Sequence, residues 1–220
     1  MMLDMDTWMT RFLAALEKTF TGRVWFVGLQ GSRARGEARE ESDIDVVVVL
    51  DCLTAADIAR YSAMLEALPA RPLICGFLSG REELVHWRAS DLFQFCHDTT
   101  AYKGTLDDVL ALVDEAAVRE AVHLGACNIY HGCVHNMVHE KDAVILADLY
   151  KAARFVAQAI VYLETGRYVH SSDALRAAAA PEERMILETA QAFKEKKTVC
   201  FETASEMLFQ WAQRWIVEMG

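Results

Sequence analysis

Two short groups of residues near the start of the chain have the side chains needed to bind a nucleotide and a metal ion. The first is Gly31-Ser32, which follows an apolar run ending at Leu29. The second is Asp43 and Asp45, separated by the apolar residue Ile44. Residues i and i+2 of a β-strand project from the same face. Both carboxylates are therefore expected to point to one place, while Ile44 turns into the core.

The acids supply metal ligands, and the Gly-Ser turn supplies hydrogen-bond donors for phosphate. Two neighbouring carboxylates form a site for a hard cation, and carboxylates with retained water molecules suit Mg²⁺. Gly31 allows the backbone to approach a ligand closely, its N–H groups can donate to phosphate oxygens, and the Ser32 hydroxyl adds a donor. Either pair alone is common in solvated turns. The two in this order, with Asp43 twelve residues after Gly31, favour a reaction centre.

The segments Gly31-Ser32-Arg33-Ala34-Arg35-Gly36 and Ser42-Asp43-Ile44-Asp45 resemble the signature of the DNA polymerase beta nucleotidyltransferase superfamily. They are similar in particular to small bacterial members, which join a minimal catalytic domain to a helical domain. The remainder resembles, more loosely, the helical C-terminal domain of kanamycin nucleotidyltransferase. The resemblance implies that Gly31 and Ser32 hold a nucleoside triphosphate and that Asp43 and Asp45 ligate metal, with two Mg²⁺ ions as cofactors.

The implied reaction is an in-line displacement at the α-phosphorus of ATP or another nucleoside triphosphate, with pyrophosphate as the leaving group. We expect a nucleoside monophosphate, AMP in the first instance, to pass to a hydroxyl of a small-molecule acceptor. An aminoglycoside-like polycation would suit the acidic chain. Two alternatives stay open. One is an antitoxin-like regulator that binds or adenylylates a protein partner, and the other is a nucleotide-binding pseudoenzyme.

Arg33 and Arg35 follow the turn, where their guanidinium groups could neutralise phosphate charge. The family usually has a third carboxylate on a later strand. The obvious candidate strand, residues 73–78, carries Cys75 and Gly76 and no acid. We therefore expect Asp98, which ends an apolar run, to be the third catalytic and metal-binding acid. Weaker candidates are Asp91, Glu82 and Glu83.

The general base is not assigned by the motif. Asp148 and Lys151 lie about one helical turn apart and share a helix face. In related two-domain transferases a helical-domain carboxylate activates the acceptor hydroxyl and a nearby lysine contacts phosphate. The resemblance thus makes Lys151 a nucleotide-binding candidate and Asp148 a candidate base, against an ordinary surface ion pair.

Histidines recur at a spacing of four at His131, His135 and His139, with His123 and Cys127 extending the series. Pairs of this spacing on a helix can hold a transition metal. Steps of four over-rotate a helix by roughly 40°, so the whole series does not share one face. Polar packing or a pocket wall is the favoured interpretation, with metal binding as the alternative.

Composition limits the class of protein. The chain has 220 residues and a net charge of −10, which disfavours nucleic acid as a partner. Its six cysteines are dispersed and its N-terminus is acidic, so we expect reduced, mostly buried thiols in a cytoplasmic protein. No apolar run is long enough to cross a membrane. Apolar stripes on the C-terminal helices would also suit a homodimer.

The elements that must position these residues indicate an α+β fold. In residues 1–103, helical and strand patterns alternate, as expected for a nucleotidyltransferase domain with a mixed sheet flanked by helices. Residues 104–220 lack strand signals and predict a helical bundle. Its main helices are expected at residues 106–139, 143–165, 181–194 and 203–217. Residues 92–96 could be a further strand or a helix.

Overall fold

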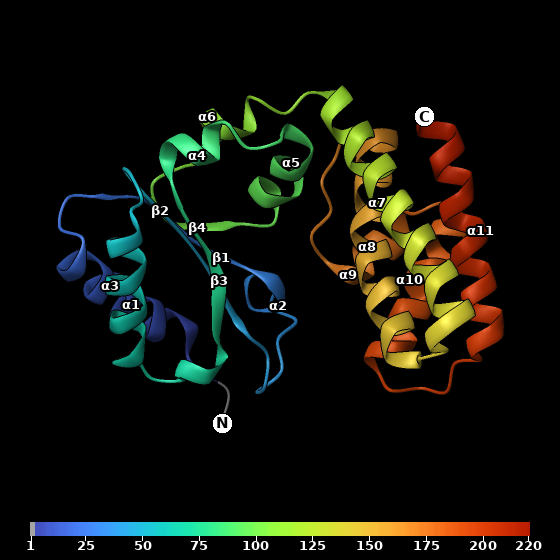
Figure 1. Ribbon diagram of the computed structural model, residues 1–220, viewed down its shortest axis with the longest axis horizontal. Coiled ribbons are helices and arrows are strands. Elements are labelled where there is room, and N and C mark those ends of the chain that lie inside the picture. Colours follow the sequence, from blue (N-terminus) through green and yellow to red (C-terminus); the bar gives the residue numbers. More distant parts are fainter. Residues whose placement is uncertain (1–2) are drawn as a thin grey trace. The chain divides into compact units, whose positions relative to one another are not determined.

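A four-stranded sheet in the order β3-β2-β1-β4 carries the Gly-Ser turn and the paired acids (Figure 1). Its strands are β1 (Val24–Gln30), β2 (Ile44–Leu50), β3 (Ile74–Gly80) and β4 (Thr100–Lys103). β1 pairs antiparallel with β2 and β4, whereas β3 runs parallel to β2. The sheet is mixed, which confirms the predicted α+β class.

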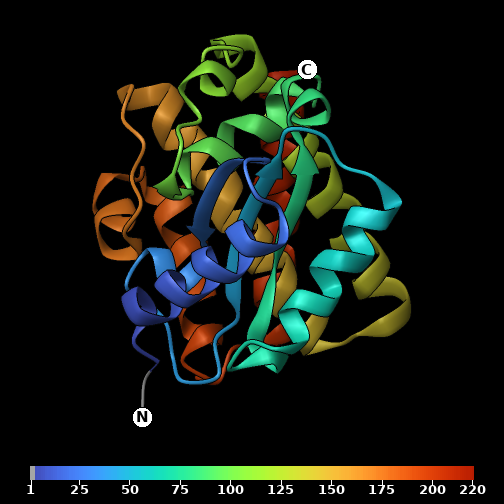
Figure 2. The ribbon, with the colours of Figure 1, turned by 90° about the vertical axis from the view of Figure 1, so that its left-hand side faces the viewer.

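One face of this sheet is covered by α1 (Met5–Thr19) and α3 (Ala55–Glu66), which Figure 2 shows in front of the strands. Alternate residues of β2, including Ile44 and Val46, are buried in the core that these helices share with the sheet. Trp8 and Phe12 stack in the same core, with ring centroids 5.2 Å apart. Because side chains alternate along a strand, the odd-numbered residues of β2, among them Asp45, project from the opposite face.

Arg23 joins the start of β1 to the end of β2 and to α3. Its guanidinium contacts the carboxylates of Asp57 at 2.9 Å and Asp51 at 3.1 Å. The Arg23 hydrogen bonds, followed by one from Thr54, hold the pKa of the Asp57 carboxyl well below its usual range. A depressed carboxyl pKa stabilises the fold above the unfolded-state pKa, and that contribution is lost as the pH falls.

The computed structural model describes residues 3–220, which divide into two units. The first runs to Arg88 and resumes from Phe95 to Leu112, whereas the second comprises Ala89–Gln94 and Val113–Gly220. Helix α5 (Ala89–His97) contributes to both units, and the expected junction between residues 103 and 104 lies in the first. The short helices of the first unit are α2 (Gly31–Ala34), η1 (Arg71–Leu73), α4 (Arg81–Val85) and α6 (Asp107–Leu110).

The second unit is helical, as predicted. Its elements are α7 (Glu115–His135), η2 (Asn136–Glu140), α8 (Ala143–Thr165), α9 (Ser172–Ala178), α10 (Pro181–Lys194) and α11 (Phe201–Met219). A separate hydrophobic core unites them, and within it the Tyr150 hydroxyl donates to Ala204 O at 2.8 Å. Gly166 ends α8 in the left-handed conformation, because a residue without Cβ adopts positive φ at little cost.

The structure also corrects several expectations. Residues 92–96 are helical, so the strand alternative is wrong. The helix expected over residues 106–139 is instead α6, α7 and the π-helical turn η2. Cys96 and Cys133 are buried, and burial raises the pKa of each thiol to about 12. Cys52, Cys75 and Cys200 are exposed and Cys127 is intermediate, so the expectation of mostly buried thiols is wrong.

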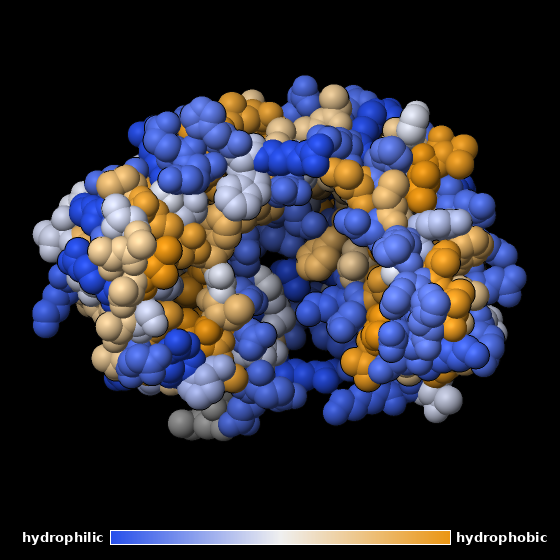
Figure 3. All heavy atoms as spheres, viewed as in Figure 1, coloured by the Kyte–Doolittle hydropathy of each residue, from blue (hydrophilic) through white to orange (hydrophobic). Residues whose placement is uncertain are grey.

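Hydrophilic side chains dominate the face shown in Figure 3, interrupted by separate apolar patches. Exposed apolar side chains include Val138, Val144 and Val217. Over residues 3–220, no helix is both long and apolar enough to cross a bilayer.

A buried carboxylate links α10 to α11 in the helical unit. Glu183 is 1% exposed. Its Oε1 accepts hydrogen bonds from the indole N–H groups of Trp211 and Trp215, each at 3.1 Å, and from Arg214 Nη2 at 2.8 Å. This single oxygen therefore satisfies three donors on α11.

Replacing Glu183 by Leu should lower the free energy of unfolding by about 3 kcal/mol, because it leaves buried donors without an acceptor. Glu183→Gln, which keeps an acceptor oxygen, should cost less. The matched control is Glu182→Leu, since Glu182 is exposed and also pairs with Arg214. Urea unfolding measures all three variants. Equal stability of Glu183→Leu and Glu182→Leu would contradict the assignment.

Candidate active site

The turn at the end of β1 brings the predicted phosphate-binding residues against one of the predicted metal ligands. Gln30, the last residue of β1, pairs with Asp45 of β2, and Gly31 follows with φ +72°. A Cβ atom on Gly31 would lie 2.1 Å from Asp45 Oδ2. Both the positive φ and this close approach require glycine. The turn and the carboxylate thus occupy one site.

Asp43 immediately precedes β2, and Asp45 is its second residue. Ile44 between them is fully buried, whereas Asp43 is exposed and Asp45 is partly exposed. The core on the Ile44 side belongs to α1 and α3. Asp45 therefore projects from the other face, and the exposure of both acids leaves them open to solvent and to a ligand.

Arg33 holds the loop between the turn and the acids. Its side chain is buried, with Nε 3.0 Å from Asp43 O and 3.1 Å from Ser42 O. Nη2 also donates to Ser42 O at 2.6 Å. A buried guanidinium needs several acceptors, and here main-chain carbonyls provide them. This contact network fixes the backbone that leads into Asp43.

Arg35 lies between two carboxylates. Its Nη1 is 3.7 Å from Asp98 Oδ2, and its Nε is 3.7 Å from Glu37 Oε2. Asp98 is 8% exposed, and its Oδ1 has no hydrogen-bond partner within residues 3–220. A buried carboxylate oxygen without a donor is costly, so a ligand or cation at this position would satisfy it.

Gln30 connects these parts, a role that sequence reasoning did not find. Its Nε2 donates to Thr99 Oγ1 at 2.7 Å and to Phe95 O at 3.1 Å. These bonds tie the end of β1 to the last turns of α5 and to Thr99, the residue that follows Asp98. In the sequence, only the position of Gln30 directly before the Gly-Ser turn hinted at such a role.

Comparison with known proteins identifies this arrangement. The family described as nucleotidyltransferase domain matches residues 9–90, a span that includes the turn and both acids. Residues 9–90 form a nucleotidyltransferase domain.

A solved structure shows a similar fold over a longer span. Spectinomycin adenyltransferase AAD(9) from Enterococcus faecialis, crystallised with ATP and spectinomycin, aligns over 96% of this chain and 98% of its own. The TM-score is 0.60 and the identity is 13%, so the likeness concerns the fold. A nucleotidyltransferase-like protein from Exiguobacterium sibiricum 255-15 aligns over 97% of this chain and 75% of its own. Its identity is 8% and its TM-score is 0.35. No curated protein matches the sequence.

In the nucleotidyltransferase domain, Cys75 lies where a third acid was sought. β3 pairs with β2 in parallel, and Cys75 is the direct partner of Asp45. Direct partners in a parallel pair share a face, and the Cys75 thiol is exposed. This neighbour was not visible in the sequence, because it depends on the pairing of strands far apart along the chain.

The two carboxylates at the start of β2 suit a hard cation. Asp43 and Asp45 offer carboxylate oxygens, and Mg²⁺ commonly takes one or two carboxylates and fills its other positions with water and phosphate oxygens. Within the part of the chain that the structure describes, no three His, Cys, Asp or Glu side chains gather closely enough to hold a metal ion. Asp98 is thus not grouped with the paired acids, and its role as a ligand stays a prediction.

The weaker acidic candidates lie elsewhere. Asp91 belongs to the segment of α5 that clusters with the helical unit. Glu82 is exposed beside His86, at 4.0 Å from the ring. Glu83 lies against Gly80, where a Cβ would be 2.2 Å from Glu83 Oε2.

The two site candidates from the helical part of the chain lie in the second unit. Asp148 and Lys151 are both exposed on α8. That Asp148 is the general base and that Lys151 contacts phosphate stay predictions.

The histidines follow an exposed line on α7 and η2. The His135 and His139 rings are 4.9 Å apart, and His135 Nε2 lies 3.5 Å from Glu140 Oε1. His131 is further along, with its ring 6.5 Å from that of His135. No three-residue metal group includes them among residues 3–220.

The close approach at Gly31 gives a sharp test. Gly31→Ala should displace the Asp45 carboxylate and reduce nucleotidyl transfer by about 100-fold, as ångström-scale misplacement of a reacting group does. Gly36→Ala is the matched control, because Gly36 has φ +71° and a Cβ added there would meet no neighbour within 4 Å. Both variants should lose about 1 kcal/mol of stability from the strained φ. Similar activity of the two variants would show that the Gly31–Asp45 contact does not matter for turnover.

Proposed function

We propose that this chain is a Mg²⁺-dependent enzyme that transfers a nucleoside monophosphate, AMP from ATP in the first instance, to a hydroxyl of a small-molecule acceptor. The observation that carries the proposal is the contact of the Asp45 carboxylate with the Gly31 turn. It joins a phosphate-binding backbone to a metal-binding acid. The similar fold of an adenyltransferase crystallised with ATP and spectinomycin supports the choice of substrates.

In the reaction, the acceptor oxygen forms a bond to the α-phosphorus, and the bond from that phosphorus to the bridging oxygen of the β-phosphate breaks. Pyrophosphate leaves with the electron pair, and the hydroxyl proton passes to a carboxylate or to water. When bound, Mg²⁺ would neutralise charge on the phosphates.

The residues of the chain then have distinct roles. Gly31 and Ser32 would donate hydrogen bonds to the triphosphate, while Asp43 and Asp45 would hold the metal. Arg33 would act as a positioning residue through its bonds to the loop. Arg35, held beside Asp98, would be the guanidinium that meets phosphate.

The net charge of −10 favours a cationic or neutral acceptor, and an aminoglycoside-like polycation has both hydroxyls and positive charge. Lys151 and Asp148 remain candidates for phosphate contact and general base. The helical unit makes this chain unlike a minimal nucleotidyltransferase that neutralises a separate helical partner.

Asp43→Asn and Asp45→Asn should each lower turnover by more than about 100-fold, because loss of even an outer residue of a metal site costs 10- to 100-fold. Pyrophosphate release from ATP with saturating Mg²⁺, measured across a panel of hydroxyl acceptors, provides the assay. Transfer of label from α-labelled ATP identifies the acceptor. Asp108→Asn, an exposed carboxylate on α6, is the matched control. Absence of pyrophosphate release with every nucleotide and acceptor would reject the enzyme, and binding without turnover would favour a pseudoenzyme.

A second pair of variants tests the third acid. If Asp98 ligates metal, Asp98→Asn should reduce turnover by at least about 10-fold and raise the Mg²⁺ concentration needed for half-maximal rate. Cys75→Asp places an acid beside Asp45, with Cys200→Asp as the exposed-cysteine control. If Asp98→Asn left turnover unchanged and Cys75→Asp raised it, Asp98 would be rejected as the third metal ligand. Position 75 on β3 would then be the favoured place for that acid.

A further inference from the structure

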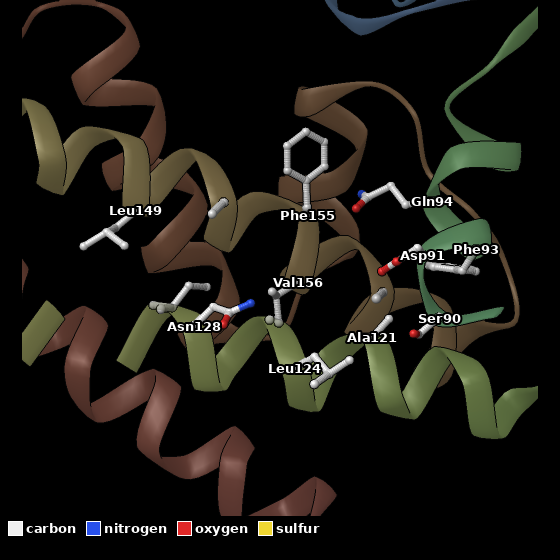
Figure 4. A pocket seen from close by; sticks show the side chains of 14 residues that line it. Ser90, Asp91, Phe93, Gln94, Ala121, Leu124, Asn128, Leu149, Phe155 and Val156 are labelled. Atoms are coloured by element: carbon white, nitrogen blue, oxygen red, sulfur yellow. The ribbon is translucent and has the colours of Figure 1, made fainter. Parts of the chain in front are cut away.

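A cavity of about 400 Å³ lies within the helical unit, between α5, α7 and α8 (Figure 4). Its volume is in the range of small-molecule sites. The α5 residues that line it, from Ser90 to Gln94, belong by their contacts to the same unit as α7 and α8. The cavity is therefore a feature of one unit.

Ser90 supplies an unpaired polar group to this cavity. The residue is 3% exposed, and its Oγ has no hydrogen-bond partner among residues 3–220. In Figure 4 its oxygen points away from α5 and into the cavity. Buried hydroxyls are nearly always hydrogen-bonded, and each exception calls for a missing partner. A ligand with an N–H or O–H group would provide that partner.

The charge of the lining favours a cation. Asp91 is the one charged side chain among the described residues that line the cavity. The lining also contains two amides, Gln94 on α5 with Asp91 and Asn128 on α7. Gln94 Nε2 donates to Gln158 Oε1 at 3.4 Å. An ammonium group has three donors and no acceptor, so hydroxyl, carboxylate and amide oxygens suit it.

The rest of the lining is apolar or small. Leu124, Leu149, Phe155 and Val156 form apolar walls. Arg154 lies over the Phe155 ring at 5.5 Å from its centroid, so that ring already has a cation partner. An apolar group of the ligand, rather than its charge, would therefore pack near Phe155, and Asp91 would meet the charge.

The space persists because α7 and α8 meet closely at one point. A Cβ on Gly125 would lie 2.4 Å from Val156 Cγ2, so the helices are already in contact there. Alanines at 121, 152 and 159 leave the neighbouring volume unfilled. Further collapse of the helices onto the space is blocked at Gly125.

We propose that this cavity binds a small amphipathic amine, with its ammonium group at Ser90 and Asp91 and its apolar part against Leu124 and Phe155. The site goes beyond the proposed transfer reaction and does not rest on it. Binding, rather than nucleotide turnover, is the property that tests it.

Isothermal titration of the full chain with 2-phenylethylamine, 2-phenylethanol and phenylacetate compares a cation, a neutral molecule and an anion of similar size. The amine should bind at least about 10-fold more tightly than the anion. Asp91→Asn should weaken the amine and leave the alcohol unchanged. Ser90→Ala should weaken the amine about 5- to 10-fold without lowering the thermal midpoint, because it removes a hydroxyl that is unpaired in the free protein.

Ala152→Leu, at an exposed residue of the lining, should fill the cavity and abolish binding. The matched control is Ala143→Leu, exposed on the same helix and outside the lining, which should bind as the wild type does. Equal affinity for amine and anion, or unchanged binding by folded Ala152→Leu, would overturn the proposal. Loss of nucleotide turnover has no bearing on this result, so the two proposals fail separately.

Discussion

The proposed reaction centre depends on one constraint, which is that no side chain can stand between Gly31 and the Asp45 carboxylate. The antiparallel pairing of β1 and β2 sets Gln30 opposite Asp45, so the turn that follows must pass directly over that acid. Positive φ at Gly31 then folds the chain into α2. As a result, a backbone suited to phosphate and a carboxylate suited to metal are built from one cross-strand pair, and they cannot shift independently.

Polar side chains around this contact act mainly on the backbone. Arg33 binds the carbonyls that precede Ile44, and Gln30 binds the segment that carries Asp98. At the far end of the strands, Arg23 instead binds the side-chain carboxylates of Asp51 and Asp57. In each case a buried or partly buried polar group satisfies several partners, which offsets the cost of its desolvation. Such groups fix the backbone that carries the proposed reacting residues.

The sequence predicted the parts of the site that are local. Four consecutive valines after Asp45 indicated a strand buried on both faces, and these valines are buried in β2. Position along the chain could not predict that Cys75 lies beside Asp45, because that depends on the parallel register of β3. Nor could it decide residues 92–96, since a short apolar run suits a strand or a buried helix equally. The bonds of Arg33 to the carbonyls of Ser42 and Asp43 could not be predicted either, because they are defined only once the loop has folded.

The difference between local and long-range contacts explains why the motif indicates a reaction but does not identify the acceptor. The phosphate and metal binding proposed at Gly31, Ser32, Asp43 and Asp45 needs a turn and one strand. A cavity such as that between α5, α7 and α8 takes its shape from three helices separated by tens of residues. Its walls, including Ala152 and Leu124, can change in size without altering β1 or β2, because they belong to a different hydrophobic core. Ligand choice in the helical unit can therefore vary while the geometry at Gly31 and Asp45 stays fixed.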